Sequence, residues 1–157
     1  MCDGMGGGPS GKAASSTATD VIIQTVRSGK LSDSPLTVLQ QAIKMANQAL
    51  ISEIQKKPAL RGMGTTVTAL LINEYSAIAA YVGDSRIYQF RRGHKKFRTF
   101  DHSMVFEMVR NGTINEEQAR LSEQSNMITK ALGANSDIEA DIVELPYEKG
   151  DRFMLCT

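Results

Sequence analysis

The stretch DGMGGGPSGK, residues 3–12, places one carboxylate beside five glycines. Glycine adopts positive φ without steric cost and lets another group approach the backbone closely. An Asp at the edge of such a loop is a natural ligand for a hard cation, and the free N–H groups of the loop and of a following helix suit a phosphate. The stretch therefore predicts a site for a metal ion, a phosphate group or both.

Two other interpretations of this stretch are open. Gly6, Gly11 and Lys12 match the G-x-x-x-x-G-K spacing of the phosphate-binding P-loop, but Ala13 stands where that motif needs a hydroxyl for magnesium. Only two residues precede the loop, too few for the strand that a P-loop follows. A flexible glycine linker is the plainest alternative, although a linker would not lead directly into a helix.

Two helices are predicted after the loop. Apolar residues recur at helical spacing between 13 and 26, and Gly29 closes this segment. The sequence Asp33-Ser34-Pro35 starts a second helix, with Ser34 as its N-cap and Pro35 at its first position. Its apolar stripe is Leu36, Leu39, Ile43, Ala46, Leu50 and Ile54. Met45 and Leu60 are also expected to pack.

Strands are predicted where short apolar or alternating runs are bounded by turn residues. The runs are 67–72, 77–82, 86–91, 97–100, 138–145 and 152–156. The first is apolar on both faces, which is typical of a buried strand, and consecutive hairpins imply antiparallel sheets. Thr65 and Thr66 fit this pattern as ordinary β-branched strand residues.

Residues 103–125 interrupt the strand pattern. Two short helices are expected at 104–110 and 116–122, and Asn115 with Gln118 forms a capping-box start for the second. The segment is polar and poorly striped, as expected of an excursion over the surface.

Three further motifs, together with the first loop, decide between these interpretations. They are GMGTT at 62–66, VGDSR at 82–86 and DHS at 101–103, followed by ITKALG at 128–133 and GDRFMLCT at 150–157. In this order and spacing the set resembles the metal-dependent type 2C (PPM) serine/threonine protein phosphatases of the compact bacterial kind. The resemblance covers essentially the whole chain.

The resemblance implies an α+β fold, an α-β-β-α sandwich of two antiparallel sheets flanked by helices. It makes residues 1–157 a partial phosphatase domain, with 103–125 as the flap beside the active site. The family's upstream acidic motif and its downstream Asp-Gly and Asp-Asn motifs are absent, so the resemblance predicts a fragment that lacks both ends of the domain.

The resemblance also assigns roles to site residues. It implies that Asp3 bridges two metal ions, that Gly4 offers its carbonyl to one of them, and that Asp84 holds a third, weaker ion. From the residues alone, Asp84 could instead bond its own turn backbone. Arg86 is expected to hold a carboxylate in place.

One departure from the family concerns proton donation. Some members carry a His in the first loop as a general acid, whereas this chain has Met5, which has no proton to give. The proton could come from metal-bound water or from another group. His102 in the DHS motif is the weak candidate for a catalytic acid, with a structural or helix-capping role as its alternative.

The implied reaction is hydrolysis of phosphoserine and phosphothreonine in proteins by a water that metal ions activate. Two Mn²⁺ or Mg²⁺ ions, with a third at Asp84, are the implied cofactors. Phosphorylated proteins are the implied substrates, with a serine/threonine kinase and its targets as partners, and the fragment itself is expected to be inactive. A non-catalytic pseudophosphatase or sensor domain is the alternative, and a P-loop nucleotide binder is less favoured.

Composition and charge exclude several other classes of partner. The net charge of +1 gives no general attraction to nucleic acid or to an anionic membrane. The basic run between Arg91 and Arg98 is interpreted as the solvated tip of a hairpin, with a docking patch for acidic or phosphorylated peptides as the alternative. Two cysteines, no signal-peptide pattern and no long apolar run predict a cytoplasmic protein.

Overall fold

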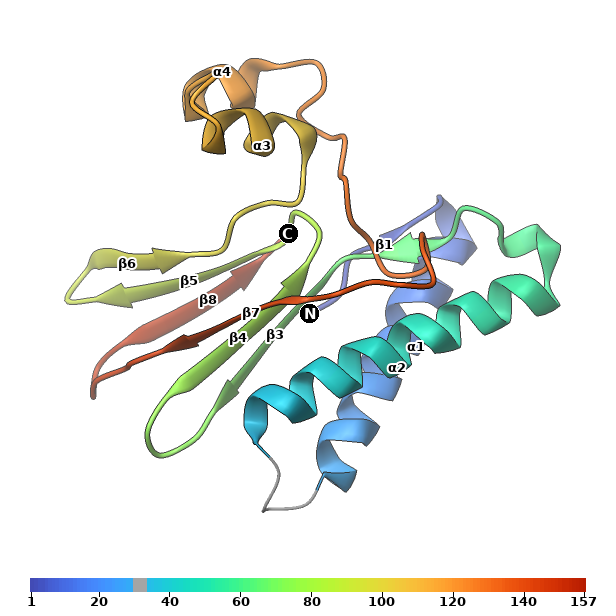
Figure 1. Cartoon of the computed structure of the whole chain (residues 1–157), viewed down its shortest axis with the longest axis horizontal. Helices are drawn as coiled ribbons and strands as arrows, with labels where there is room; N and C mark the ends of the chain where they lie inside the picture. Colours follow the sequence, from blue (N-terminus) through green and yellow to red (C-terminus); the bar gives the residue numbers. More distant parts are fainter. Residues whose placement is uncertain (30–33) are drawn as a thin grey trace.

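A computed structural model describes residues 1–29 and 34–157 of the chain. Two helices cover one face of a three-stranded sheet, and a second three-stranded sheet lies against the other face (Figure 1). The elements in chain order are β1 (Gly4–Met5), α1 (Gly8–Ser28), α2 (Pro35–Lys56), the 3₁₀ turn η1 (Pro58–Leu60), β2 (Gly64–Thr65), β3 (Val67–Ile72), β4 (Ala77–Val82), β5 (Arg86–Arg91), β6 (His94–Arg98), α3 (Met104–Arg110), α4 (Glu116–Leu121), β7 (Asp141–Leu145) and β8 (Arg152–Cys156).

The two long helices lie where the sequence placed them, with differences at their ends. Helix α1 begins at Gly8, inside the glycine stretch rather than after it, and Gly29 ends it with an ordinary φ of −59°. Ser34 is the N-cap of α2 and Pro35 its first residue, but the Ser34 hydroxyl makes no capping hydrogen bond. The Asp33 part of the predicted helix start lies outside the described residues.

Helices α1 and α2 build the larger core against sheet β3-β4-β7. Ala14, Ala18 and Ile22 of α1 are buried, and the buried stripe of α2 is Leu39, Ala42, Ile43, Ala46, Asn47 and Leu50. The predicted stripe is wrong at Leu36, which is 39% exposed because it precedes the first turn that reaches the core. Met45 was also expected to pack. It is instead 41% exposed and lies beside the Thr25 hydroxyl of α1.

The strands form two separate sheets, ordered β3-β4-β7 and β6-β5-β8, and all their pairings are antiparallel. The consecutive hairpins therefore do not continue in one sheet. The chain crosses from one sheet to the other at residues 83–85, directly after β4. The inner faces of both sheets enclose a second core around Ala77, Ala79, Ile87 and Leu145. In the described residues the second sheet has no long helix on its outer face, so this part of the sandwich is α-β-β.

Two predicted strands have different bounds in the structure. Strand β7 starts at Asp141 instead of residue 138. Asp141 pairs with Tyr81, which is the last residue of β4 that pairs with β7. Strand β6 covers His94–Arg98 instead of 97–100. Arg92 and Gly93 both have positive φ, 50° and 79°, and such a two-residue turn lets pairing resume at once.

The segment 103–125 contains the two expected helices, and the Asn115–Gln118 capping box is present. It is better packed than its polar sequence suggested, because Val105, Phe106 and Ala119 form a small core of their own. Arg86 and Arg98, from the second sheet, both lie over the Phe106 ring. None of the helices in the described residues is long and apolar enough to span a membrane.

Candidate metal centre

Three distant parts of the chain meet at one end of the two sheets: the first loop with Asp3, the crossing with Asp84, and the end of β8. The Thr157 hydroxyl donates a 2.5 Å hydrogen bond to Asp3 Oδ2, and Figure 1 shows the end marked C beside the β4–β5 connection. Asp84, Arg86 and Thr157 line a cavity of about 280 Å³ that also borders helices α3 and α4. The structure thus brings Asp3 and Asp84 to one place.

The first loop is shaped by a close approach between two glycines. Strand β1 pairs with β2, so that Gly4 lies opposite Thr65. A Cβ at Gly4 would lie 1.8 Å from the carbonyl oxygen of Gly11, and one at Gly11 would lie 2.7 Å from the carbonyl oxygen of Gly4. Only glycine fits at both positions, and this holds Asp3 and Gly4 against the start of α1.

Two threonine hydroxyls hold Asp3 through its backbone. The Thr65 hydroxyl donates to the Asp3 carbonyl at 2.9 Å, and the Asp3 N–H donates to Thr66 Oγ1 at 3.1 Å. Both side chains are buried. Their interpretation as ordinary strand residues was therefore incomplete, and the signal that could have revealed it is the pair of adjacent hydroxyls directly after a glycine in a buried run.

His102 supports the turn that carries Asp84. Its Nδ1 accepts a hydrogen bond from the Gly83 N–H at 3.0 Å, which places the ring proton on Nε2. The ring stacks on Tyr81 with centroids 5.3 Å apart, and Nε2 lies 3.4 Å from Asp141 Oδ1 without the alignment of a hydrogen bond. Burial lowers the pKa of His102, so the neutral ring is favoured.

Asp84 is a half-buried carboxylate with little to offset its charge. Burial raises the pKa of Asp84, repulsion from Asp101 and Asp3 adds to this, and a hydrogen bond from its own backbone opposes it. None of the ion pairs within residues 1–29 and 34–157 includes Asp84. A bound cation would offset the cost of burying the charged carboxylate and its repulsion from Asp101 and Asp3.

Arg86 holds a carboxylate in place, as the sequence predicted. Its Nε and Nη2 donate to the two oxygens of Asp101 at 2.8 and 2.5 Å, and the Asp101 side chain is only 4% exposed. Hydrogen bonding to Asp101 raises the already high pKa of Arg86. Asp101 is thus held in an ion pair with Arg86, whereas Asp84, which lines the same cavity, has no ion pair among the described residues.

These residues fit a hard divalent cation in kind but not in number. The carboxylates of Asp3 and Asp84 and the carbonyl of Gly4 are the oxygen ligands that Mg²⁺ and Mn²⁺ prefer. Across the described part of the chain, however, no three His, Cys, Asp or Glu side chains gather closely enough to hold an ion. Asp3, Gly4 and Asp84 therefore offer oxygen donors of the right kind for such an ion, and the described residues supply too few of them to hold it alone.

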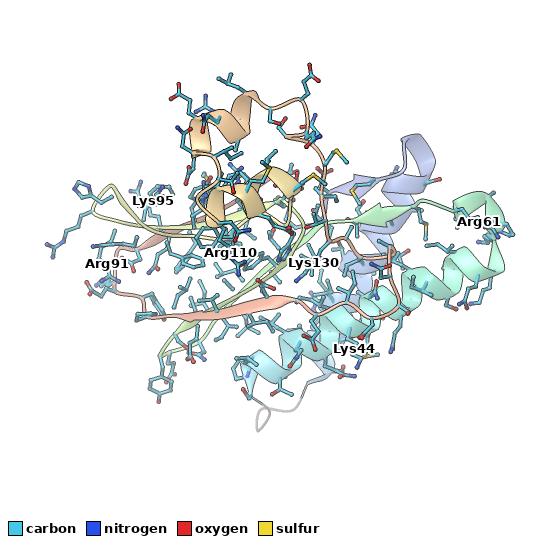
Figure 2. All side chains as sticks on the ribbon, turned by 45° about the horizontal axis from the view of Figure 1, so that its top comes forward. Lys44, Arg61, Arg91, Lys95, Arg110 and Lys130 are labelled. Atoms are coloured by element: carbon cyan, nitrogen blue, oxygen red, sulfur yellow. The ribbon has the colours of Figure 1, made fainter. Side chains whose placement is uncertain are left out.

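Two members of the basic run are paired with acids. Arg91 pairs with Asp151 and Glu148, and Arg98 pairs with Glu116. Figure 2 shows Arg91 and Lys95 at the far end of the β5–β6 hairpin, while Arg61 lies at the opposite end of the molecule.

The comparisons with known proteins agree with this geometry. The sequence model of the family "Protein phosphatase 2C" matches residues 1–157, and the chain belongs to this family. It is 31% identical to the serine/threonine phosphatase stp of Listeria innocua over 100% of this chain and 64% of that protein. The chain thus spans about 64% of the length of this curated relative.

Solved structures show the same fold. The structure of the Mycobacterium tuberculosis serine/threonine phosphatase PstP/Ppp aligns with a TM-score of 0.90 and 30% identity, over 99% of this chain and 66% of that one. The catalytic domain of PstP in complex with two manganese ions aligns with a TM-score of 0.83 and 30% identity, over 98% of this chain and 64% of that one. The fold of the chain is that of a partial phosphatase domain of this family.

Proposed function

We propose that this chain is part of a metal-dependent phosphatase that hydrolyses phosphoserine and phosphothreonine in proteins. The observation that carries the proposal is the convergence of Asp3, Gly4 and Asp84 at one end of two packed sheets. Membership of the protein phosphatase 2C family supports it. Because the chain spans only part of its relatives, the activity is proposed for the complete protein.

Asp3 and Gly4 would hold the pair of Mn²⁺ or Mg²⁺ ions, and Asp84 would hold a third. Such ions supply a nucleophile at neutral pH and neutralise charge on the transferring phosphoryl group. The two manganese ions in the PstP structure support this choice of metal. The residues of this chain contribute the oxygen ligands and the scaffold that fixes them: the two glycines under the first loop, the threonines behind Asp3, and the Arg86–Asp101 pair.

His102 is proposed as a supporting residue rather than the catalytic acid. Its Nδ1 is occupied by the Gly83 N–H, and its Nε2 is buried beside Asp141. Met5, in the first loop, has no proton to donate. The group that protonates the leaving oxygen is therefore sought outside these two positions.

The remaining parts of the proposal concern organisation and setting. We assign residues 103–125 as a flap beside the candidate site, because α3 and α4 have their own core and border the Asp84 cavity. The substrates are phosphorylated proteins, with a serine/threonine kinase and its targets as partners. A cytoplasmic location fits the free thiols of Cys2 and Cys156.

The proposal is tested by calorimetric titration of Mn²⁺ into the complete protein and two variants, because the described residues of the 157-residue chain supply too few ligands by themselves. Asp20, exposed on α1 and remote from the first loop in sequence, provides the matched control. We expect the complete protein and its Asp20→Asn variant to bind Mn²⁺ equally and Asp3→Asn to lose that binding. Equal binding by Asp3→Asn would contradict the assignment of Asp3 as a ligand.

The complete protein tests the substrate class. We expect it to release phosphate from phosphoserine and phosphothreonine peptides only with Mn²⁺ or Mg²⁺ present. The 157-residue chain is expected to hydrolyse p-nitrophenyl phosphate far more slowly, because its described residues supply too few ligands. Full turnover by the short chain would overturn that reasoning.

A further inference from the structure

Two buried hydroxyls connect the loops that carry Asp3 and Asp84. Thr66 Oγ1 and Ser85 Oγ lie 2.7 Å apart, and both residues are 2% exposed. Thr66 Oγ1 also accepts the Asp3 N–H at 3.1 Å. A hydroxyl can accept and donate at once, so Thr66 contacts both loops through one oxygen.

The methyl group of Thr66 packs against the Gly83–Ser85 turn. A Cβ at Gly83 would lie 2.6 Å from Thr66 Cγ2, so the methyl group fills the space that a side chain at position 83 would need. Gly83 has a φ of 104°, a conformation that other residues rarely adopt. Both branches of the Thr66 side chain are therefore used: the hydroxyl for Asp3 and Ser85, and the methyl for Gly83.

The neighbouring Thr65 shows that this arrangement is specific to Thr66. Thr65 Oγ1 donates to the carbonyl oxygens of Asp3 and Thr66 and has no contact with the Gly83–Ser85 turn among its hydrogen bonds. It holds one loop, whereas Thr66 touches both. Thr65 is thus a matched control at the adjacent position.

We propose that Thr66 is a positioning residue that fixes the separation of Asp3 from Asp84 through its hydroxyl bridge to Ser85. This inference rests on the proposed function, in which both carboxylates hold metal ions. Asp3 and Ser85 come from segments about eighty positions apart in the sequence, and no other side chain in the described structure bonds to both segments. Loss of the bridge lets the two loops move independently.

Amide hydrogen exchange in the 157-residue chain tests the bridge without metal. We expect Thr66→Val, which keeps the shape and removes the hydroxyl, to speed exchange about tenfold both at Asp3 and at Gly83, whose N–H is hydrogen-bonded in the turn that carries Asp84. Thr66→Ser, which keeps the hydroxyl, restores slow exchange at Asp3. Exchange at Ala79, in the middle of β4, corrects for global unfolding.

The decisive variant is Ser85→Ala, since Ser85 does not itself bond to Asp3. We expect it to speed exchange at Asp3 through the lost bridge, whereas Thr65→Val affects Asp3 but leaves Gly83 unchanged. Unchanged Asp3 exchange in Ser85→Ala, or unchanged Gly83 exchange in Thr66→Val, overturns the proposal.

Mn²⁺ titration of the complete protein carrying the same changes separates this inference from the proposed function. Equal Mn²⁺ binding by the unaltered protein and Asp3→Asn would defeat the proposed function, while the exchange results would still decide the bridge. We expect Thr66→Val to weaken Mn²⁺ binding by the complete protein about tenfold and Thr66→Ser to restore it. Parent-like binding by Thr66→Val would overturn the positioning role.

Discussion

Asp84 and Asp151 are carboxylates at opposite ends of the same sheet, and their surroundings differ completely. Asp151 receives two 2.8 Å hydrogen bonds from Arg91, one of 2.8 Å from Gln89, and one of 3.1 Å from the Glu148 N–H. These bonds hold the pKa of Asp151 well below its usual range. Burial raises the pKa of Asp84 instead. The fold pairs one acid with an arginine and leaves the other half-buried without an ion pair among the described residues.

The largest expected effects separate the acids of the candidate site in the complete protein. Asp3→Asn is expected to abolish turnover and tight metal binding together, because it removes the ligand that we propose both ions share. Asp84→Asn is expected to keep the tight metals and lower turnover by roughly one to three orders of magnitude. Calorimetry beside steady-state kinetics checks both, and full activity after Asp84→Asn would contradict its role.

The next effect concerns stability in the absence of metal. Asp151→Asn leaves Arg91 without its buried partner, and we expect the Tm to fall by roughly 5–10 °C. Asp84→Asn removes an unfavourably buried charge, so its Tm is expected to stay the same or rise slightly. Thermal melts with EDTA, with Asp20→Asn as the exposed control, measure the contrast; a larger loss at Asp84 would reverse it.

The pH dependence of stability has opposite signs at the two acids. The lowered pKa of Asp151 stabilises the fold above the ordinary value of 3.8, and this stability is lost as the pH falls through the native pKa. The raised pKa of Asp84 gives a contribution that is present at low pH and lost as the pH rises through the native pKa, above 3.8.

Urea midpoints between pH 2 and 7, without divalent metal, check these signs. We expect Asp151→Asn to flatten the loss of stability below pH 3.8 and Asp84→Asn to flatten the decline just above it. A change in the same direction for both variants would show that the two carboxylates do not differ as described.

The smallest expected effect concerns the support of Asp84 by His102. His102→Leu removes the acceptor for the Gly83 N–H, whereas the Oδ1 of His102→Asn can still reach it. We expect amide exchange at Gly83 to be about fivefold faster in the Leu variant than in the Asn variant. Equal exchange in the two would show that the ring supports the turn by stacking on Tyr81 alone.

Much of the fold could be predicted where the information is local. Strands 67–72, 77–82, 86–91 and 152–156 and helix 104–110 have the expected bounds, because apolar runs end at turn residues. The start of β7 depends on where its partner ends, 60 positions away, and no local pattern contains that fact. The switch between sheets at residues 83–85 is non-local in the same way.

The sequence places the proposed ligands of the candidate site but not most of the residues that support them. Asp3, Gly4 and Asp84 stand in recognisable motifs, although their roles as ligands stay proposals. The role of Thr66 was missed because threonine fits a strand pattern as an ordinary β-branched residue. The sequence does not show what its hydroxyl bonds to. The sequence gives Asp151 no separate role, since its partner Arg91 lies 60 positions earlier.

The contacts that hold the first loop also bear on the order of folding. Asp3 is held by Thr66, 63 positions away, and by Thr157, 154 positions away. Closing loops of this length is slow and comes after local helices and hairpins have formed. The first loop is therefore among the last parts to settle, and a metal ion bound there would add its binding energy only to the finished fold. Bound cations would then lower the unfolding rate more than they raise the folding rate.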